Sequence, residues 1–111
     1  MKLNKDLVAA SAVPLILSLL AEGESYGYAI LQRVREVSGG AIEWTDGMLY
    51  PVLHRLEAQG LIRARWRESE AGRRRKYYAL EAGGKQALAE QKEQWLLVQA
   101  TLGKLWGAQH A

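Results

Sequence analysis

The hydrophobic pattern of this chain changes its period at Gly60, and that change limits the folds open to it. Before this glycine, four aliphatic residues share one face of a helix: Leu49, Val52, Leu53 and Leu56. After it, three residues alternate with arginines, as in a half-buried strand: Ile62, Ala64 and Trp66. Glycine often ends a helix because it tolerates the left-handed conformation needed there. The sequence therefore predicts a helix, capped by Thr45 or Asp46, that leads directly into a β-strand.

The strand is predicted to turn back on itself as a β-hairpin. Ser, Glu, Ala and Gly at 69–72 suit a turn, and a return strand runs from about Arg74 to Leu80. In this strand Tyr78 and Leu80 lie on one face and Tyr77 lies on the other.

The hairpin also concentrates the positive charge of the chain. Residues 61–80 hold seven Arg or Lys and two Glu, a net charge of +5, whereas the whole chain carries +3. The remainder is therefore slightly acidic. A basic patch on such a body indicates a polyanionic partner.

Three further helices are predicted from apolar spacing and end signals. The first covers 4–21 with Asn4 as its cap, the second runs from Ser25 to about Val37, and the last spans 82 to about 107. Pro51 lies beyond the first turn of its helix, so the turn over 46–50 is predicted to be irregular or 3₁₀-like. Two tryptophans, Trp44 and Trp66, are interpreted as core or hairpin packing.

Three helices followed by a hairpin and a long helix define a mainly α, α+β protein. We predict a winged helix-turn-helix DNA-binding domain over 1–80, including the N-terminal helix, and a C-terminal dimerisation helix over 81–111. The last helix carries more apolar surface than one small domain can cover, at Leu96, Leu97 and Trp106. This excess predicts that the last helix packs against a partner subunit.

Several classes of function are disfavoured by composition. The chain has no cysteine, no catalytic His–carboxylate spacing, no phosphate-binding glycine loop and no cluster of metal ligands. We therefore expect no enzyme, no catalytic or metal site and no cofactor. The apolar run at 7–21 is too short to span a bilayer and lacks a cleavage signal, so we expect a cytoplasmic protein without a membrane partner.

The predicted partner is double-stranded DNA, because the outward face of the third helix and the hairpin tip carry polar and basic groups. The candidate DNA-contacting residues are Thr45, Met48, Tyr50, Pro51, His54, Arg55, Arg73, Arg74, Arg75 and Lys76. Simpler interpretations stay open: Tyr50 can merely pack, His54 can be an ordinary surface residue, and Met48 can be a spacer. The charge run can be a solvated face.

Three motifs carry a resemblance to a known family. GMLYPVLHRLEAQGLI at 47–62, SYGYAI at 25–30 and GRRRKYYAL at 72–80 resemble the PadR family of transcriptional regulators. The resemblance implies a dimeric repressor on a two-fold operator, with Arg74, Arg75 and Lys76 against phosphates. The single last helix is similar to that of the small subfamily. Glu81 departs from the pattern, because the family commonly has there a Thr that caps the last helix.

Trp95 has two interpretations. It can be an aromatic of the dimer core. It also resembles the last-helix tryptophan of multidrug-binding family members, which would imply a small planar aromatic ligand bound in a pore at the dimer centre. The residues expected to line such a pore with Trp95 are Leu7, Ala10, Val13, Val98 and Gln99. No carboxylate occurs among these positions, so the sequence gives no charge-based reason for a cationic ligand.

A second class of function stays open beside the DNA-binding regulator. A winged helix that has lost DNA binding can serve as a protein–protein adaptor. Such an adaptor would bind its partner through a large exposed apolar patch and would not use the basic hairpin to bind DNA. The intact basic run favours the regulator.

Overall fold

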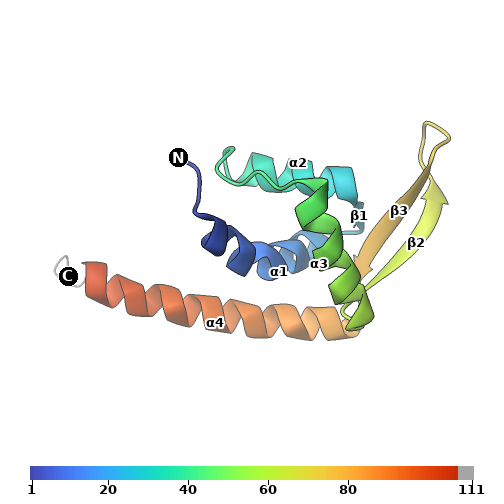
Figure 1. Ribbon diagram of the computed structural model, residues 1–111. Helices are drawn as coiled ribbons and strands as arrows, with labels where there is room; N and C mark the ends of the chain where they lie inside the picture. The colour runs from blue at the N-terminus through green and yellow to red at the C-terminus, as the bar shows by residue number, and fades with distance from the viewer. Residues whose placement is uncertain (108–111) are drawn as a thin grey trace.

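The computed structural model describes residues 1–107, which form four helices and a three-stranded sheet (Figure 1). In chain order the elements are α1 (Lys5–Ala21), β1 (Ser25–Tyr26), α2 (Gly27–Val37), α3 (Asp46–Ala58), β2 (Ile62–Glu68), β3 (Arg74–Leu80) and α4 (Ala82–Gly107). This order and the hairpin confirm the predicted winged helix-turn-helix with a long last helix.

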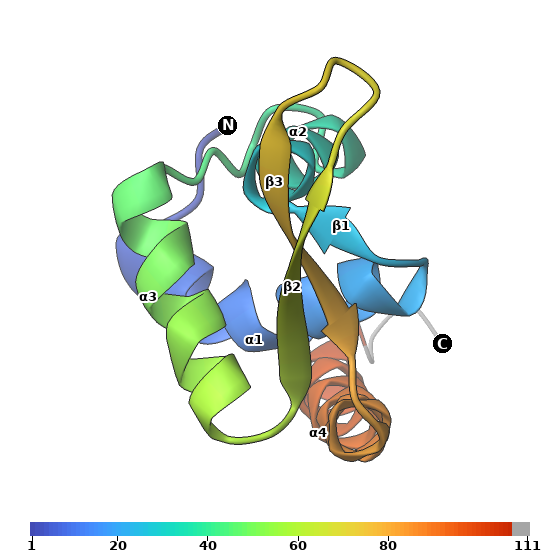
Figure 2. The same ribbon diagram turned by 90° about the vertical axis from the view of Figure 1, so that its right-hand side faces the viewer.

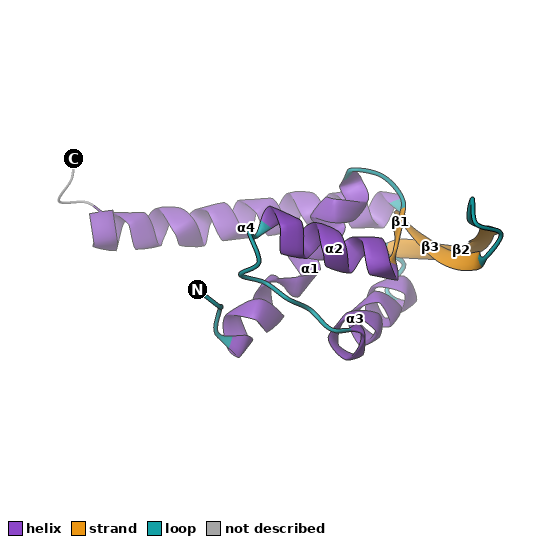
Figure 3. Cartoon of the chain, turned by 90° about the horizontal axis from the view of Figure 1, so that it is seen from above, coloured by secondary structure: helices purple, strands orange, loops and turns teal. Residues whose placement is uncertain are grey.

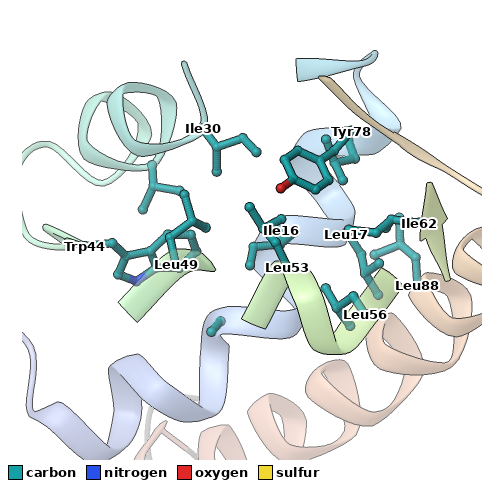
Figure 4. Close-up of a cluster of buried hydrophobic side chains, with 13 residues drawn as sticks. Ile16, Leu17, Ile30, Trp44, Leu49, Leu53, Leu56, Ile62, Tyr78 and Leu88 are labelled. Atoms are coloured by element: carbon teal, nitrogen blue, oxygen red, sulfur yellow. The ribbon is translucent and has the colours of Figure 1, made fainter. Parts of the chain in front are cut away.

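One hydrophobic core joins the helices to the base of the hairpin (Figure 4). It draws on every helix and on both long strands, and its most fully buried side chains are Ile16, Leu17, Ile30, Leu49, Leu53, Leu56, Ile62 and Tyr78. Trp44 is buried in the same cluster, as predicted. Helix α4 contributes Leu88 to it. The core therefore fixes α3 and the hairpin relative to each other.

The sheet contains a strand that the sequence did not predict. Ser25 and Tyr26 were expected to open the second helix, but they form β1, which pairs antiparallel with β3 (Figure 2). The helix begins only at Gly27, with Tyr26 extended before it. A segment of two residues is too short to show a hydrophobic period in the sequence. Its extended conformation is instead set by its pairing with β3. The prediction of a helix from Ser25 was wrong by two residues.

Helix α3 is regular from end to end. The Thr45 hydroxyl accepts a hydrogen bond from the Met48 N–H at 3.3 Å, which confirms Thr45 as the cap. The predicted irregular turn over 46–50 is absent, because Asp46–Ala58 is one continuous α-helix with Pro51 inside it. The φ angle of proline is compatible with a helix, so Pro51 removes one backbone N–H donor from α3 but does not interrupt the helix.

Helix α4 leaves the hairpin through a tight join. The Glu81 N–H donates to the Leu61 carbonyl at 3.0 Å, and the Glu81 carboxylate accepts from Arg63 at 3.0 Å. From there α4 runs beneath α1 and extends past the body on the side away from the hairpin (Figures 1 and 3). No helix among the described residues is long and apolar enough to cross a membrane.

Candidate nucleic-acid interface

The register of the hairpin sorts its side chains onto two faces. Residues paired across antiparallel strands share a face, so Ala64 and Tyr78 point to the core. Farther along the same face, outside the core, Trp66 pairs with Lys76. The opposite face holds the pairs Arg65–Tyr77 and Arg67–Arg75. The same face of the hairpin is thus buried in the core at its base and, in its outer half, lines a space shared with α2 and α3.

Most of the positive charge of β2 is compensated within the protein. Glu24, just before β1, forms ion pairs with Arg65 at 3.2 Å and with Arg67. Arg63 pairs with Glu81 at 3.0 Å. These three arginines are therefore tied to carboxylates on the body of the protein.

The charges of β3 and of the turn are not compensated in this way. Within residues 1–107, no acidic side chain forms an ion pair with Arg73, Arg74 or Arg75. The guanidinium of Arg74 lies 5.5 Å from the Trp66 ring centre, and that of Arg75 lies 4.4 Å from the Tyr26 ring centre. Aromatic rings orient a cation without cancelling its charge. The free positive charge of the hairpin is thus concentrated on this strand and at the tip.

Lys76 is intermediate between the two groups. Its Nζ lies 4.0 Å from a carboxylate oxygen of Glu57, on α3, and 5.7 Å from the Tyr78 ring centre. A pair this long is weak, so Lys76 keeps most of its attraction for an outside anion.

A groove of about 490 Å³ separates the hairpin from the N-terminus of α2 and from α3. Six of the ten candidate DNA-contacting residues line it: Tyr50, His54, Arg73, Arg74, Arg75 and Lys76. The other four lie along α3 outside the groove, with Thr45, Pro51 and Arg55 exposed and Met48 packed at the edge of the core. The structure thus gathers the basic run and part of α3 around one groove.

Five residues of this groove were missed as site candidates, namely Tyr26, Gly27, Tyr28, Trp66 and Tyr78. Trp66 was expected to pack in the core or hairpin; it lies on the hairpin outside the core, is 56% exposed, and has the Arg74 guanidinium 5.5 Å from its ring centre. The strand alternation carries part of the signal for Trp66, because it puts that residue on the inward face, but it does not show that this part of the strand lies beyond the core. Tyr28 is 64% exposed on α2, and no pattern in the sequence indicates that it belongs to this groove.

Tyr78 forms the floor of this region. Its side chain is fully buried, and its hydroxyl lacks a hydrogen-bond partner among the described residues. Burial, followed by the charge of Glu57 and the proximity of Tyr50, raises the pKa of Tyr78 to about 12. The phenol is therefore neutral at any physiological pH.

The residues predicted to bind an aromatic ligand are only partly brought together. Leu7 on α1 and Trp95 on α4 line one apolar groove of about 300 Å³, which also touches Pro14 and Ile42. The Trp95 indole donates to Gln91 at 3.2 Å. The other predicted residues lie outside this groove: Ala10, Val13, Val98 and Gln99.

A helix-turn-helix beside a hairpin with uncompensated basic charge is the architecture of a DNA-binding regulator. Residues 16–90 match the model of the transcriptional regulator PadR-like family. The chain therefore belongs to the PadR-like family of transcriptional regulators, which confirms the resemblance seen in the sequence. The family consists of regulators and not enzymes, and the described residues contain no cluster of His, Cys, Asp or Glu suited to a metal.

Similar proteins with solved structures agree in fold along most of the chain. A transcriptional regulator from Clostridium thermocellum is 30% identical, with a TM-score of 0.84, over 94% of this chain and 98% of that chain. A PadR family transcription regulator from Clostridium difficile is 32% identical, with a TM-score of 0.78, over 87% and 99% respectively. By sequence alone, the chain is also similar to the transcriptional regulator Rv3488 of Mycobacterium tuberculosis, with 38% identity over 77 residues, or 69% of this chain and 68% of that protein.

Proposed function

We propose that this regulator is a homodimeric repressor, whose α3 enters the major groove while its hairpin contacts the adjacent backbone. The observation that carries the proposal is the run Arg73–Lys76, which has little internal compensation and stands beside the exposed side of α3. Cations without partners release condensed counterions from DNA when they bind phosphate. We also propose that the protein acts in the cytoplasm, where its DNA lies.

The test is DNA binding as a function of salt concentration. The duplex upstream of the protein's own gene is the first probe, followed by duplexes that the protein selects from a random pool. Replacing Arg74, Arg75 and Lys76 by alanine should abolish specific binding and lower the slope of log K against log salt by roughly two to three units for each protomer that contacts the duplex. A reporter gene downstream of the selected site should be transcribed more strongly when the regulator is removed.

The matched control removes the same charge elsewhere. Arg35 on α2 and Lys85 and Lys92 on the near half of α4 are exposed and lie away from the tip of the hairpin. Their replacement by alanine changes the net charge equally and should leave most of the binding in place. Equal losses in both variants would assign binding to net charge and not to the hairpin. A wild-type protein that binds no duplex at low salt would favour the protein–protein adaptor.

We propose α4 as the principal dimerisation element and residues 1–80 as the DNA-binding part. The far half of α4 carries a row of exposed large apolar side chains: Leu96, Leu97, Val98, Leu105 and Trp106. Contiguous apolar surface on a protruding helix is unfavourable in water and is typical of a helix that packs on a partner. A dimer formed there would present two hairpins to the two half-sites of an operator.

Sedimentation tests the dimer directly. A carboxylate at an apolar contact would be buried without a partner, so Leu97→Glu should shift the protein toward monomer at micromolar concentration. Gln32→Glu adds the same charge on the exposed side of α2 and should leave the dimer intact. A wild-type protein that is monomeric under these conditions contradicts the proposal.

A small planar aromatic ligand at the dimer interface is a second part of the proposal. The support is the shared groove of Leu7 and Trp95, whose lining is mostly apolar. A planar dye that stacks on Trp95 should quench its fluorescence, and Trp95→Ala should remove that quenching while the other three tryptophans remain. Quenching that is the same in wild type and variant would exclude Trp95 as the ligand site.

A further inference from the structure

Trp66 occupies a position that core packing does not explain. It lies on the inward face of β2, two residues beyond Ala64, where the core has already ended. Its side chain is 56% exposed, and its aromatic contact among the described residues is with the guanidinium of Arg74, 5.5 Å from the ring centre. Leaving more than half of an indole in water is unfavourable, and the contact with Arg74 covers only part of it.

The surroundings of Trp66 indicate what kind of molecule covers it. It lines the groove of about 490 Å³ together with Arg73, Arg74 and Lys76, and faces Tyr50 and His54 of α3. The hairpin side of the groove thus offers cations that can bind phosphates and, among these cations, one flat apolar surface, the indole of Trp66. A DNA strand has the matching alternation, because charged phosphates are separated by deoxyribose rings with apolar faces.

We propose that Trp66 is a DNA-contacting residue, whose indole packs against a deoxyribose of the strand that passes between the hairpin and α3. Arg74, held over the same ring, then meets the neighbouring phosphate. This inference rests on the proposed DNA binding and adds to it an uncharged contact on the hairpin. Apolar burial against sugar gives affinity at every sequence, so Trp66 strengthens binding without reading bases.

Salt dependence separates this role from a structural one. An uncharged contact releases no counterion, so Trp66→Ala should weaken binding roughly 5- to 30-fold and leave the slope of log K against log salt unchanged. Arg74→Ala should lower that slope by about one unit for each protomer that contacts the duplex. If Trp66 merely held Arg74 in place, Trp66→Ala would lower the slope as Arg74→Ala does, and the inference would be wrong.

Fluorescence provides an independent readout on the full chain. The emission of wild type minus that of Trp66→Phe reports Trp66 alone, and a selected duplex should quench this difference. Trp66→Phe should keep affinity within about threefold of wild type, because a phenyl ring retains most of the flat apolar contact. Unfolding curves and sedimentation of both variants should match wild type.

The outcomes distinguish this inference from the function on which it rests. If wild type binds duplex DNA but Trp66→Ala binds equally well and no quenching occurs, the inference fails while the proposed function stands. If Trp66→Ala changes the oligomeric state, the indole belongs to a protein interface and the inference also fails. If wild type binds no duplex at all, both fail together.

Discussion

Gly27, the first residue of α2, lies directly against the phenol of Tyr50 on α3. A Cβ placed on Gly27 would lie 2.1 Å from the Tyr50 hydroxyl oxygen and 2.7 Å from its Cζ atom. Only a residue without a side chain leaves room here for the Tyr50 phenol. The contact therefore determines where this phenol of the helix proposed to enter the DNA groove lies, in the groove beside the hairpin.

We predict that Gly27→Ala destabilises the protein by roughly 1–3 kcal/mol, because the added methyl group displaces Tyr50 or separates the helices. Tyr50→Ala removes the obstacle. In a double-mutant cycle from urea unfolding, Gly27→Ala should therefore cost much less in the Tyr50→Ala background. Additive effects of the two substitutions would contradict the contact.

Tyr78 should make the stability of the protein sensitive to alkaline pH. Its pKa is raised from 10.0 to about 12 in the folded state, mainly by burial. Folding then favours the protonated phenol, so this contribution is complete below pH 10 and is lost as the pH rises toward about 12. The loss amounts to at most about 1.4 kcal/mol per pH unit.

Tyr78→Phe should remove this dependence. It should also be at least as stable as wild type at neutral pH, because the buried hydroxyl has no partner to lose. The measurement is the free energy of unfolding of wild type minus that of the variant, followed with pH. Tyr28→Phe, which removes an exposed hydroxyl, is the control. A difference that stays constant above pH 10 would contradict the assignment to Tyr78.

The parts of the fold set by local periodicity were predictable, and the parts set by distant pairing were not. Leu49, Leu53 and Leu56 recur at helical spacing and are all buried in the core, so α3 was correctly predicted from its own sequence. Ser25 and Tyr26 form a strand only because β3 lies beside them, and β3 is some fifty residues away in the chain. Nothing in a two-residue segment reveals such a partner.

The candidate interface shows the same division. A run of cations is visible in the sequence, but the sequence does not show which cations already have carboxylate partners. Glu24 is close in space to Arg65 and Arg67 only because β1 brings it to the sheet. Trp66 was read as a packing residue because strand alternation says which face a side chain takes and not where the core ends along it.

Glu24 should restrain DNA binding, because it compensates two arginines of the hairpin. Glu24→Gln keeps the shape of the side chain and frees the charges of Arg65 and Arg67. We expect roughly two- to fivefold tighter binding to mixed-sequence duplex at low salt, with a gain that disappears as salt screens the added field. Glu36→Gln removes a carboxylate paired with Arg33 at 3.2 Å near the end of α2 and should leave affinity unchanged. A Glu24→Gln protein with wild-type affinity at low salt would show that these arginines lie away from DNA.

Two adjacent glycines at the start of α4 should respond oppositely to the same substitution. A Cβ on Gly84 would lie 2.1 Å from the Leu61 carbonyl oxygen, a backbone atom that cannot move without shifting the join between hairpin and helix. Gly83 has only ordinary contacts, the nearest at 3.6 Å. Gly84→Ala should therefore destabilise by roughly 1–3 kcal/mol, whereas Gly83→Ala should stabilise by up to about 1 kcal/mol, because alanine favours a helix. Thermal unfolding measures both.

The same pair tests whether the direction of α4 matters for DNA binding. In a dimer joined through α4, a shift at Gly84 changes the separation of the two hairpins, and the hairpins must fit half-sites about 34 Å apart. Gly84→Ala should thus weaken binding to a two-half-site duplex more than binding to a single half-site. Gly83→Ala should affect neither. If Gly84→Ala weakened both probes equally, the join would serve stability alone and would not set the spacing of the hairpins.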